Sequence, residues 1–323
     1  MTDPARHPAP HRDGVIVLGA PRSGTTLVRR LLDAHPNITA PGETHLLAAS
    51  ARFLSSEPSS GGLDVGVLTG LGYMDFASDD VVRRLREFAF GFHREHAARH
   101  GTTRWLEKTA IDAFHVPEIE QLCGDDAYFV CITRHGLDVA CSMRDWCERA
   151  EVYLANVHKY ISRHARPLEA FTHAWVDATT AIRAFAECHP DNAILLRYED
   201  LVANPDEELR RVIEFIGEPW DDDLISRALS GDADPRGFSD WKTFSKSVIG
   251  ASSIGRWHSL SSPTIRELAA IANPTLVACG YEAIDTQSSV DDDDEAARRR
   301  YELGLMMQKL RSEDGDSGDD SED

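Results

Sequence analysis

The sequence predicts a three-layer α/β fold in which a central parallel sheet is flanked by helices. Short apolar runs, typical of buried strands, alternate along the chain with longer segments of helical periodicity. A glycine-containing loop, GAPRSGTT at residues 19–26, also joins the first such strand to the first such helix. Strands that alternate with helices form parallel sheets through right-handed crossovers, so the pattern indicates this fold class.

The first strand is predicted at residues 15–19, VIVLG, because the run is short, apolar and rich in β-branched residues. Apolar residues at helical spacing then predict a helix at residues 25–34, which Pro36 ends. Residues 55–70 are rich in Ser, Pro and Gly and are expected to form a surface loop. A further helix is expected at residues 79–98.

Two more buried strands are predicted at residues 127–134, AYFVCITR, and at residues 192–201, NAILLRYEDL. The segment GLDVACSMRDW after the first of these strands is expected to be helical, and so are residues 167–188. A helix is also predicted at residues 205–217, with acidic residues in its first turn and Gly217 at its end.

The chain of 323 residues is long enough to bury one sizeable core, and no long linker divides its middle. We therefore expect one domain at residues 14–284, preceded by a disordered leader at residues 1–13 and followed by an acidic extension at residues 285–323. From Glu282 onward, 15 acidic residues stand against 5 basic ones, so half of the net charge of −20 lies there. The extension is expected to contain a helix at residues 291–311 and then to be disordered.

Composition argues against several function classes. The acidic net charge disfavours non-specific binding of nucleic acid. No run approaches the ~18 apolar residues of a membrane span, and the start of the sequence lacks the apolar stretch of a signal peptide. None of the six cysteines forms a C-x-x-C pair, and their scatter through apolar segments is typical of reduced thiols. We expect a cytoplasmic protein that binds no metal, nucleic acid or membrane.

The glycine loop differs from the standard phosphate-binding pattern G-x-x-x-x-G-K-[ST] in one respect. Gly19, Gly24 and Thr26 keep the spacing, but Thr25 stands in place of the lysine and Arg22 lies inside the loop. Backbone N–H groups in such a loop bind anions without the lysine. In ATP and GTP enzymes that lysine reaches the β- and γ-phosphates, so its absence argues against γ-phosphoryl transfer. Arg22 still offers a positive charge to an oxyanion.

Residues 20–38, APRSGTTLVRRLLDAHPNI, resemble the 5′-phosphosulfate loop of sulfotransferases that use 3′-phosphoadenosine 5′-phosphosulfate (PAPS). The sequence is most similar to the branch with the tyrosylprotein sulfotransferases and their bacterial relatives, over residues 14–282. The resemblance implies a P-loop fold, PAPS as the sulfonate donor, no metal, and 3′,5′-adenosine bisphosphate (PAP) as the product. It assigns the phosphosulfate to the loop residues Arg22, Ser23, Gly24, Thr25 and Thr26.

The segment ITRHGLDVACSM matches the 3′-phosphate site of this family, in which an arginine ends a strand and a serine follows eight positions later. Arg134 and Ser142 stand in these places. Ligands of α/β sheets collect at the carboxyl ends of strands, and an arginine with a hydroxyl suits a phosphate monoester. Tyr198 in LLRYEDL matches a family tyrosine near the nucleotide, with ordinary core packing as the alternative role.

A later segment, SSIGRWHSLS at residues 252–261, resembles the family loop that closes over the adenine and the 3′-phosphate. The resemblance assigns Arg256 to the phosphate and Trp257 to the base. The tyrosylprotein branch has Ser-Lys-Trp where this chain has Gly255, Arg256 and Trp257.

Sulfonyl transfer needs a base for the acceptor hydroxyl and positive charge near the leaving phosphate. Glu43 in APGETHLL matches the place of the family's catalytic glutamate and is our expected base. His45, which replaces a family arginine, is the alternative, because imidazole titrates near neutral pH. The resemblance assigns Lys108 in WLEKTAID to the bridging oxygen, with Arg22 on the other side, and we expect Glu107 to be a solvated partner of Lys108.

The acceptor is expected to be a hydroxyl on a small molecule, a phenol or a sugar. Residues 144–175 are rich in aromatic and basic groups, which either line an acceptor pocket or pack over the sheet. Two alternative functions remain: a P-loop kinase that uses Mg²⁺-ATP, and a non-catalytic nucleotide-binding or scaffold protein. Some family members form dimers, so a homodimer is compatible with the resemblance.

Overall fold

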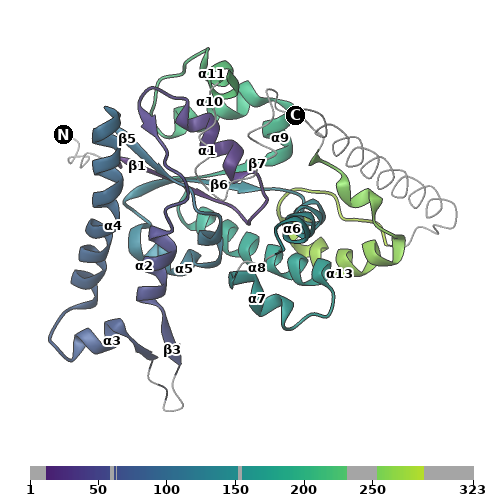
Figure 1. Cartoon of the computed structure of the whole chain (residues 1–323), viewed down its shortest axis with the longest axis horizontal. Coiled ribbons are helices and arrows are strands. Elements are labelled where there is room, and N and C mark those ends of the chain that lie inside the picture. Colours follow the sequence, from purple (N-terminus) through teal and green to yellow (C-terminus); the bar gives the residue numbers. More distant parts are fainter. Residues whose placement is uncertain (1–11, 59–61, 63, 152–154, 231–252, 287–323) are drawn as a thin grey trace, which may run out of the picture.

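The computed structural model describes residues 12–58, 62, 64–151, 155–230 and 253–286. Within them, five parallel strands form one sheet in the order β2–β5–β1–β6–β7 (Figure 1). The strands are β1 (Gly14–Leu18), β2 (Ile38–Thr39), β5 (Arg104–Glu107), β6 (Ala127–Thr133) and β7 (Ala193–Arg197). The predicted parallel sheet is therefore confirmed.

Helices cover both faces of this sheet, which confirms the predicted three layers (Figure 1). On one face lie α1 (Thr25–Asp33), α9 (Tyr198–Ala203), α10 (Pro205–Phe215) and α11 (Leu224–Ser230). On the other lie α2 (Leu46–Leu54), α4 (Ser78–His100), α5 (Val116–Cys123), α6 (Gly136–Ala150), α8 (Pro167–Cys188) and α13 (Ser262–Ala278). Side chains alternate across a strand, so Val15 and Val17 enter one core while Ile16 and Leu18 enter the other.

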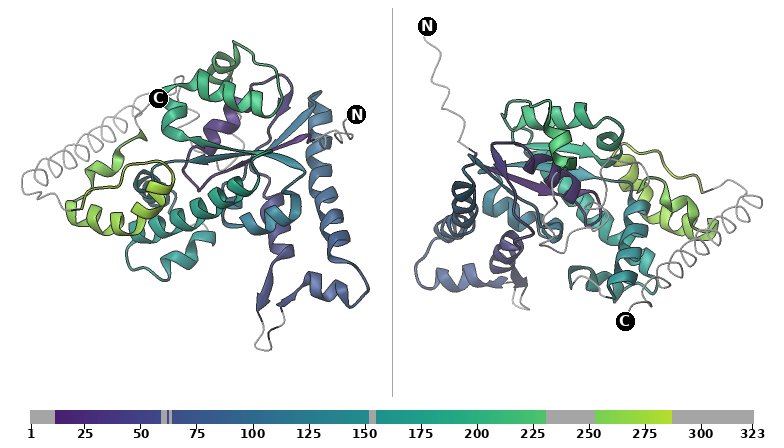
Figure 2. Two further views of the ribbon diagram at one scale, coloured as in Figure 1. Left: turned by 180° about the vertical axis from the view of Figure 1, so that it is seen from behind. Right: turned by 45° about the horizontal axis from the view of Figure 1, so that its top comes forward.

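The segment predicted as a surface loop at residues 55–70 is more ordered than expected. It forms a short antiparallel hairpin of β3 (Ser56–Pro58) and β4 (Asp64–Gly66), and then begins α3 (Val67–Gly72). Figures 1 and 2 show that this part projects away from the sheet. The segment is exposed, as predicted. Its hairpin was not predicted, because so short a polar stretch of sequence shows no strand pattern.

One strand prediction needs correction, and the sheet strands β2 and β5 were not predicted. The strand expected at residues 192–201 ends at Arg197, and Tyr198 begins the helix α9. In addition, β5 was not predicted, because RWLE is too short and too mixed in polarity to show a strand pattern. It is nevertheless an interior strand of the sheet, between β2 and β1.

The order of the strands determines where a site can form. Because β5, β1, β6 and β7 are parallel neighbours, their carboxyl ends meet at one edge of the sheet. The residues that directly follow these ends are Lys108, the glycine loop that begins at Gly19, Arg134 and Tyr198. Ligands of open α/β sheets bind at this edge.

The remaining described elements are α7 (Ala155–Ile161) and two 3-10 helices, η1 (Ala110–Phe114) and η3 (Arg256–Ser259). The predicted helix at residues 291–311 and the leader up to residue 11 lie outside the described residues. Among the described helices, none combines the length and the apolar character needed to cross a bilayer. Four of the six cysteines are buried, Cys188 is exposed, and all six are free thiols.

A substitution at Gly14 tests the close packing of the sheet on α4. A Cβ atom at Gly14 would lie 2.1 Å from the Trp105 ring, which is itself fully buried. We expect Gly14→Ala to lower the free energy of unfolding by about 1–3 kcal/mol, because the ring must move. The control Gly91→Ala, on the exposed face of α4 with no atom within 4 Å, should instead stabilise the protein by about 0.5–1 kcal/mol. Equal midpoints of urea unfolding for the two variants would contradict this packing.

Candidate active site

The glycine loop has the backbone geometry of an anion site. Arg22 and Gly24 both have left-handed backbone angles, with φ of 75° and 99°. Alternation of this kind in a turn lets successive N–H groups converge on an anion. Helix α1 begins directly after Gly24, and no side chain caps its N-terminus. The first N–H groups of α1 are therefore available to a bound oxyanion.

Two buried donors near this loop have no hydrogen-bond partner among the described residues. They are the Ser23 hydroxyl in the loop and the Nε of Arg134 at the end of β6. Buried polar atoms in folded proteins nearly always have a partner, so both atoms point to a ligand that accepts hydrogen bonds. Phosphate oxygens satisfy this requirement, and the residues present therefore fit an anionic ligand.

Contacts between side chains join the loop to the predicted second phosphate site. The Arg22 Nε donates to the Ser142 hydroxyl at 3.2 Å, and an Arg134 N–H donates to the Arg22 carbonyl at 2.9 Å. Another Arg134 N–H donates to the Ser253 carbonyl, and burial lowers the pKa of Arg134. The structure thus brings Arg22 together with Arg134 and Ser142, although the sequence places Arg22 more than 100 residues before both of them.

Tyr198 borders the loop from the start of α9. Its ring lies under the Arg134 guanidinium, 4.8 Å from the centroid, and it packs so closely on Gly24 that a Cβ there would lie 2.5 Å from the ring. Gly24 is therefore required both by its backbone angle and by the close contact with Tyr198.

Residues 253–261, which we call the late loop, are held against α6 by an aspartate that sequence reasoning did not single out. Both oxygens of the buried Asp138 carboxylate accept backbone hydrogen bonds, from Gly255 at 2.8 Å and from Trp257 at 3.2 Å. The Trp257 ring stacks on His135 with centroids 5.2 Å apart. Arg256 is ion-paired with Asp145 on α6. Position 252 of the predicted segment lies outside the described residues.

Lys108 and Glu43 form an ion pair beside the loop. The Lys108 ammonium is fully buried, donates to a Glu43 carboxylate oxygen, and lies 3.5 Å from the Thr26 hydroxyl of the loop. Burial lowers the pKa of Lys108, and the Glu43 carboxylate opposes that shift. His45, the alternative base, is exposed and has a left-handed backbone angle with φ of 59° at the start of α2. The geometry therefore places Glu43, rather than His45, in direct contact with Lys108.

The expectation for Glu107 was wrong. We expected a solvated partner of Lys108, but Glu107 is fully buried at the end of β5 and points to other residues. Its carboxylate accepts hydrogen bonds from the Thr44 hydroxyl at 2.7 Å and the Thr109 hydroxyl at 2.5 Å. The Nε2 of His93 lies 3.3 Å away. Side chains alternate along a strand, so Glu107 and Lys108 face opposite ways although they are adjacent in sequence.

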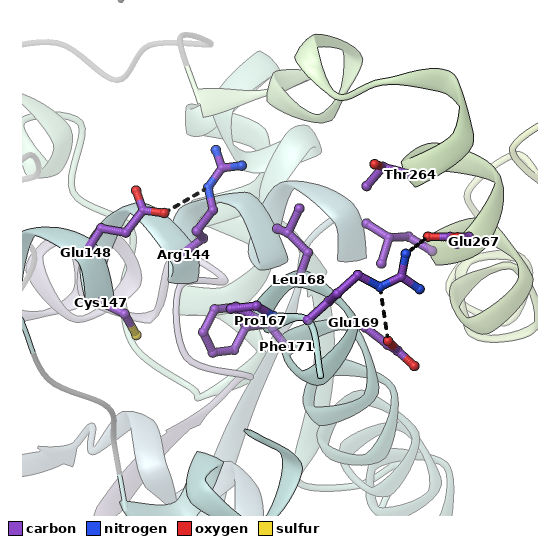
Figure 3. Close-up of a pocket in the computed structure, with 11 residues that line it drawn as sticks. Arg144, Cys147, Glu148, Pro167, Leu168, Glu169, Phe171, Thr264 and Glu267 are labelled. Atoms are coloured by element: carbon purple, nitrogen blue, oxygen red, sulfur yellow. Dashed lines mark hydrogen bonds and ion pairs between the residues drawn. The ribbon is translucent and has the colours of Figure 1, made fainter. Parts of the chain in front are cut away.

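A separate pocket lies between α6, α8 and α13 (Figure 3). It has a volume of about 330 Å³, and Leu168, Phe171 and Leu268 contribute to its apolar lining. Arg166 bridges the Glu169 and Glu267 carboxylates across it. Eight of its eleven lining residues come from the range 144–175, so part of that segment lines a cavity. Phe171 also lines a smaller cavity beside Ala20 and Pro21, next to the glycine loop.

The described residues contain one group of side chains with the composition of a metal site. The ligand atoms of His164, Glu169 and His173 lie within 4.8 Å of one another. This group includes none of the residues at the glycine loop, and Glu169 is also paired with Arg166.

Comparison with known proteins matches residues 14–222 to the model of the sulfotransferase family. A putative protein-tyrosine sulfotransferase of Caenorhabditis briggsae is 28% identical over 293 residues, covering 86% of this chain and 91% of the relative. The nodulation protein NoeE of Sinorhizobium fredii is 26% identical, covering 82% of this chain and 65% of its own. The sulfotransferase domain from the curacin biosynthetic pathway has the same fold, with a TM-score of 0.56, 19% identity, and coverage of 84% of this chain and 98% of that domain.

A double-mutant cycle tests the buried ion pair. We expect Glu43→Gln to lower the free energy of unfolding by about 3 kcal/mol, because it leaves a fully buried ammonium without its carboxylate. Lys108→Met should cost less, because Glu43 keeps some contact with solvent. The double variant should then be more stable than the sum of the single effects by at least about 1 kcal/mol in urea unfolding. Strict additivity would show that the two charges do not interact.

Proposed function

The chain belongs to the sulfotransferase family, and we propose that it transfers a sulfonate group from PAPS to a hydroxyl acceptor and releases PAP. One observation supports this donor above all. Arg22 of the glycine loop contacts both Ser142 and Arg134, so two groups of potential anion donors, one in the loop and one around Arg134, lie side by side. A donor with two separate phosphate groups matches two such arrangements, whereas the single polyphosphate chain of ATP leaves the second without a partner.

We assign the 5′-phosphosulfate to the loop residues Arg22, Ser23, Gly24, Thr25 and Thr26. Arg134 and Ser142 are assigned to the 3′-phosphate, with Tyr198 closing the nucleotide site beside Gly24. Trp257, already stacked on His135, is the proposed contact for the adenine. We assign Arg256 to the edge of the 3′-phosphate site, where its positive charge would add to that of Arg134; without a ligand it is ion-paired with Asp145.

Glu43 is the proposed base. It takes the proton of the acceptor hydroxyl, whose oxygen bonds to sulfur as the bond from sulfur to the 5′-phosphate oxygen breaks. The electron pair of that bond leaves with the phosphate, where Lys108, Arg22 and the loop N–H groups stabilise the added charge. Lys108 suits this role because its ammonium contacts Glu43 and lies 3.5 Å from Thr26. His45, two residues beyond Glu43, is the alternative base.

The proposed acceptor is a hydroxyl on a small molecule, a phenol or a sugar. A pocket of about 330 Å³ with an apolar lining supports an acceptor of this size, and its lining residue Phe171 also lines the smaller cavity beside Ala20 and Pro21. A tyrosine of a protein is the second candidate, because relatives at 24–28% identity are named protein-tyrosine sulfotransferases. No metal is assigned to the reaction, and a homodimer stays a proposal that the oligomeric state in solution would test.

Binding of PAP tests the donor. In calorimetry we expect micromolar binding of PAP and no comparable binding of Mg²⁺-ATP, the ligand of the alternative kinase. Arg134→Ala should weaken PAP binding about tenfold or more, since loss of one charge-assisted contact costs about 1.5–3 kcal/mol. Arg210→Ala, which removes an exposed arginine of α10 over Trp220, is the matched control and should bind PAP like the parent chain. Preference for Mg²⁺-ATP would favour a kinase, and binding of neither would favour the scaffold.

Transfer assays test the base. We expect Glu43→Gln to lower kcat by about 10²–10⁴, the usual contribution of a positioned base, while PAP binding is retained. PAP release should be measured with a small phenol, a sugar and a tyrosine-containing peptide as acceptors. A larger loss with His45→Gln than with Glu43→Gln would transfer the role of base to His45.

A further inference from the structure

We propose that Glu107 is a positioning residue that holds the segment carrying Glu43 against the strand end carrying Lys108. The proposal has two parts. Its structural part rests only on the contacts of Glu107, whereas its consequence for the rate rests on the function proposed above. Glu107 itself contacts neither the glycine loop nor the Arg134–Ser142 pair in any hydrogen bond of the described residues.

The structural part of the proposal rests on four hydrogen bonds and on which group donates in each. Thr44 and Thr109 each donate their hydroxyl proton to a different oxygen of Glu107, at 2.7 and 2.5 Å. The same hydroxyl oxygens accept two backbone N–H groups at the start of α2: Leu46, its first residue, donates to Thr44 at 3.2 Å, and His45, the residue before it, donates to Thr109 at 3.1 Å. One carboxylate therefore orients two hydroxyls, and the two hydroxyls fix the start of α2.

This arrangement joins two segments that are far apart in the sequence. Thr44 and His45 directly follow Glu43, while Thr109 directly follows Lys108. Holding Thr44 and Thr109 on the same carboxylate therefore keeps Glu43 and Lys108 at the distance at which they pair. Packing restricts the Glu107 side chain, because it is fully enclosed and the Nε2 of His93, whose ring stacks on Trp105, lies 3.3 Å from its Oε2.

The charges around Glu107 agree with this role. Burial raises the pKa of Glu107 to about 6, while the hydrogen bonds from Thr109 and Thr44 and the Lys108 ammonium favour its ionised form. Burial lowers the pKa of His93 to about 4, so this neighbour is neutral at pH 7. Asp112 is fully buried nearby, and burial raises its pKa well above the usual value. At pH 7.5, Glu107 is thus an acceptor for both hydroxyls.

Glutamine cannot replace Glu107 in this geometry, although the two side chains have nearly the same shape. A carboxylate accepts on both oxygens, whereas an amide accepts on its oxygen and donates from its nitrogen. With Glu107→Gln, the amide nitrogen would donate to one of the two hydroxyls, which could then no longer donate its own proton to residue 107. That proton would have to turn to a buried position without an acceptor, so one of the two links between Glu107 and α2 is weakened with little change in packing.

Hydrogen exchange measured by NMR tests the structural part without reference to the reaction. We expect Glu107→Gln to speed exchange of the His45 or Leu46 backbone N–H about tenfold or more, the effect of losing about 1.4 kcal/mol of local stability. Thr44→Val and Thr109→Val should each speed exchange at the N–H that its own hydroxyl accepts. Thr179→Val, which alters a buried hydroxyl of α8, is the control and should leave both unchanged. Unchanged exchange in Glu107→Gln would overturn the proposal.

Kinetics test the consequence for the rate. At pH 7.5, we expect Glu107→Gln to lower kcat about tenfold or more, while the Kd for PAP and the KM for PAPS change less than about twofold. Adding Thr44→Val or Thr109→Val to Glu107→Gln should cost less than the sum of the separate effects, because the variants break the same link. An unchanged kcat with faster exchange would overturn the positioning role. Failure of the parent chain to bind PAP would instead overturn the proposed function, and the exchange result would still stand.

Discussion

Burial of the Lys108 ammonium is the constraint on which the rest of the site depends. A cation removed from water must be paired, and the structure provides Glu43 as its partner and the Thr26 hydroxyl as a second polar neighbour. Lys108 can take this position because β5 lies beside β1 in the sheet, which brings the end of one strand next to the loop that follows the other. The ion pair thus couples the position of the proposed base to that of the anion site.

A second set of charged side chains, Arg134 and Arg22, lies at the same edge of the sheet. Arg134 follows β6, the neighbour of β1 on the other side, and reaches the loop backbone through the Arg22 carbonyl. Ser142 lies two turns into α6 and accepts from Arg22, so the two proposed anion-binding groups share one arginine. Asp138 on the same helix holds the late loop by two backbone N–H groups. Helix α6 therefore contributes Ser142 to the proposed nucleotide site and also fixes the late loop beside it.

Two buried carboxylates fix the positions of chain segments around this site. Asp138 and Glu107 are both enclosed, and each accepts two hydrogen bonds from segments that arrive from elsewhere in the chain. A buried carboxylate is costly unless its oxygens are satisfied, so these contacts restrict the two segments to a narrow range of positions. Loops supply most of the proposed site residues, and fixed points of this kind are what give such loops a defined geometry.

The sequence by itself determined the fold class, the strands at residues 15–19 and 127–134, and the position of the glycine loop between the first strand and the first helix. These features depend on local patterns, namely apolar runs and glycine spacing. The tertiary structure decided the rest. The strand RWLE has no clear pattern, Tyr198 begins a helix, and Glu107 looks solvated beside Lys108 but faces the opposite side of the strand. Its partners Thr44 and His93 lie 63 and 14 residues away, and burial against distant residues leaves no signal in a short stretch of sequence.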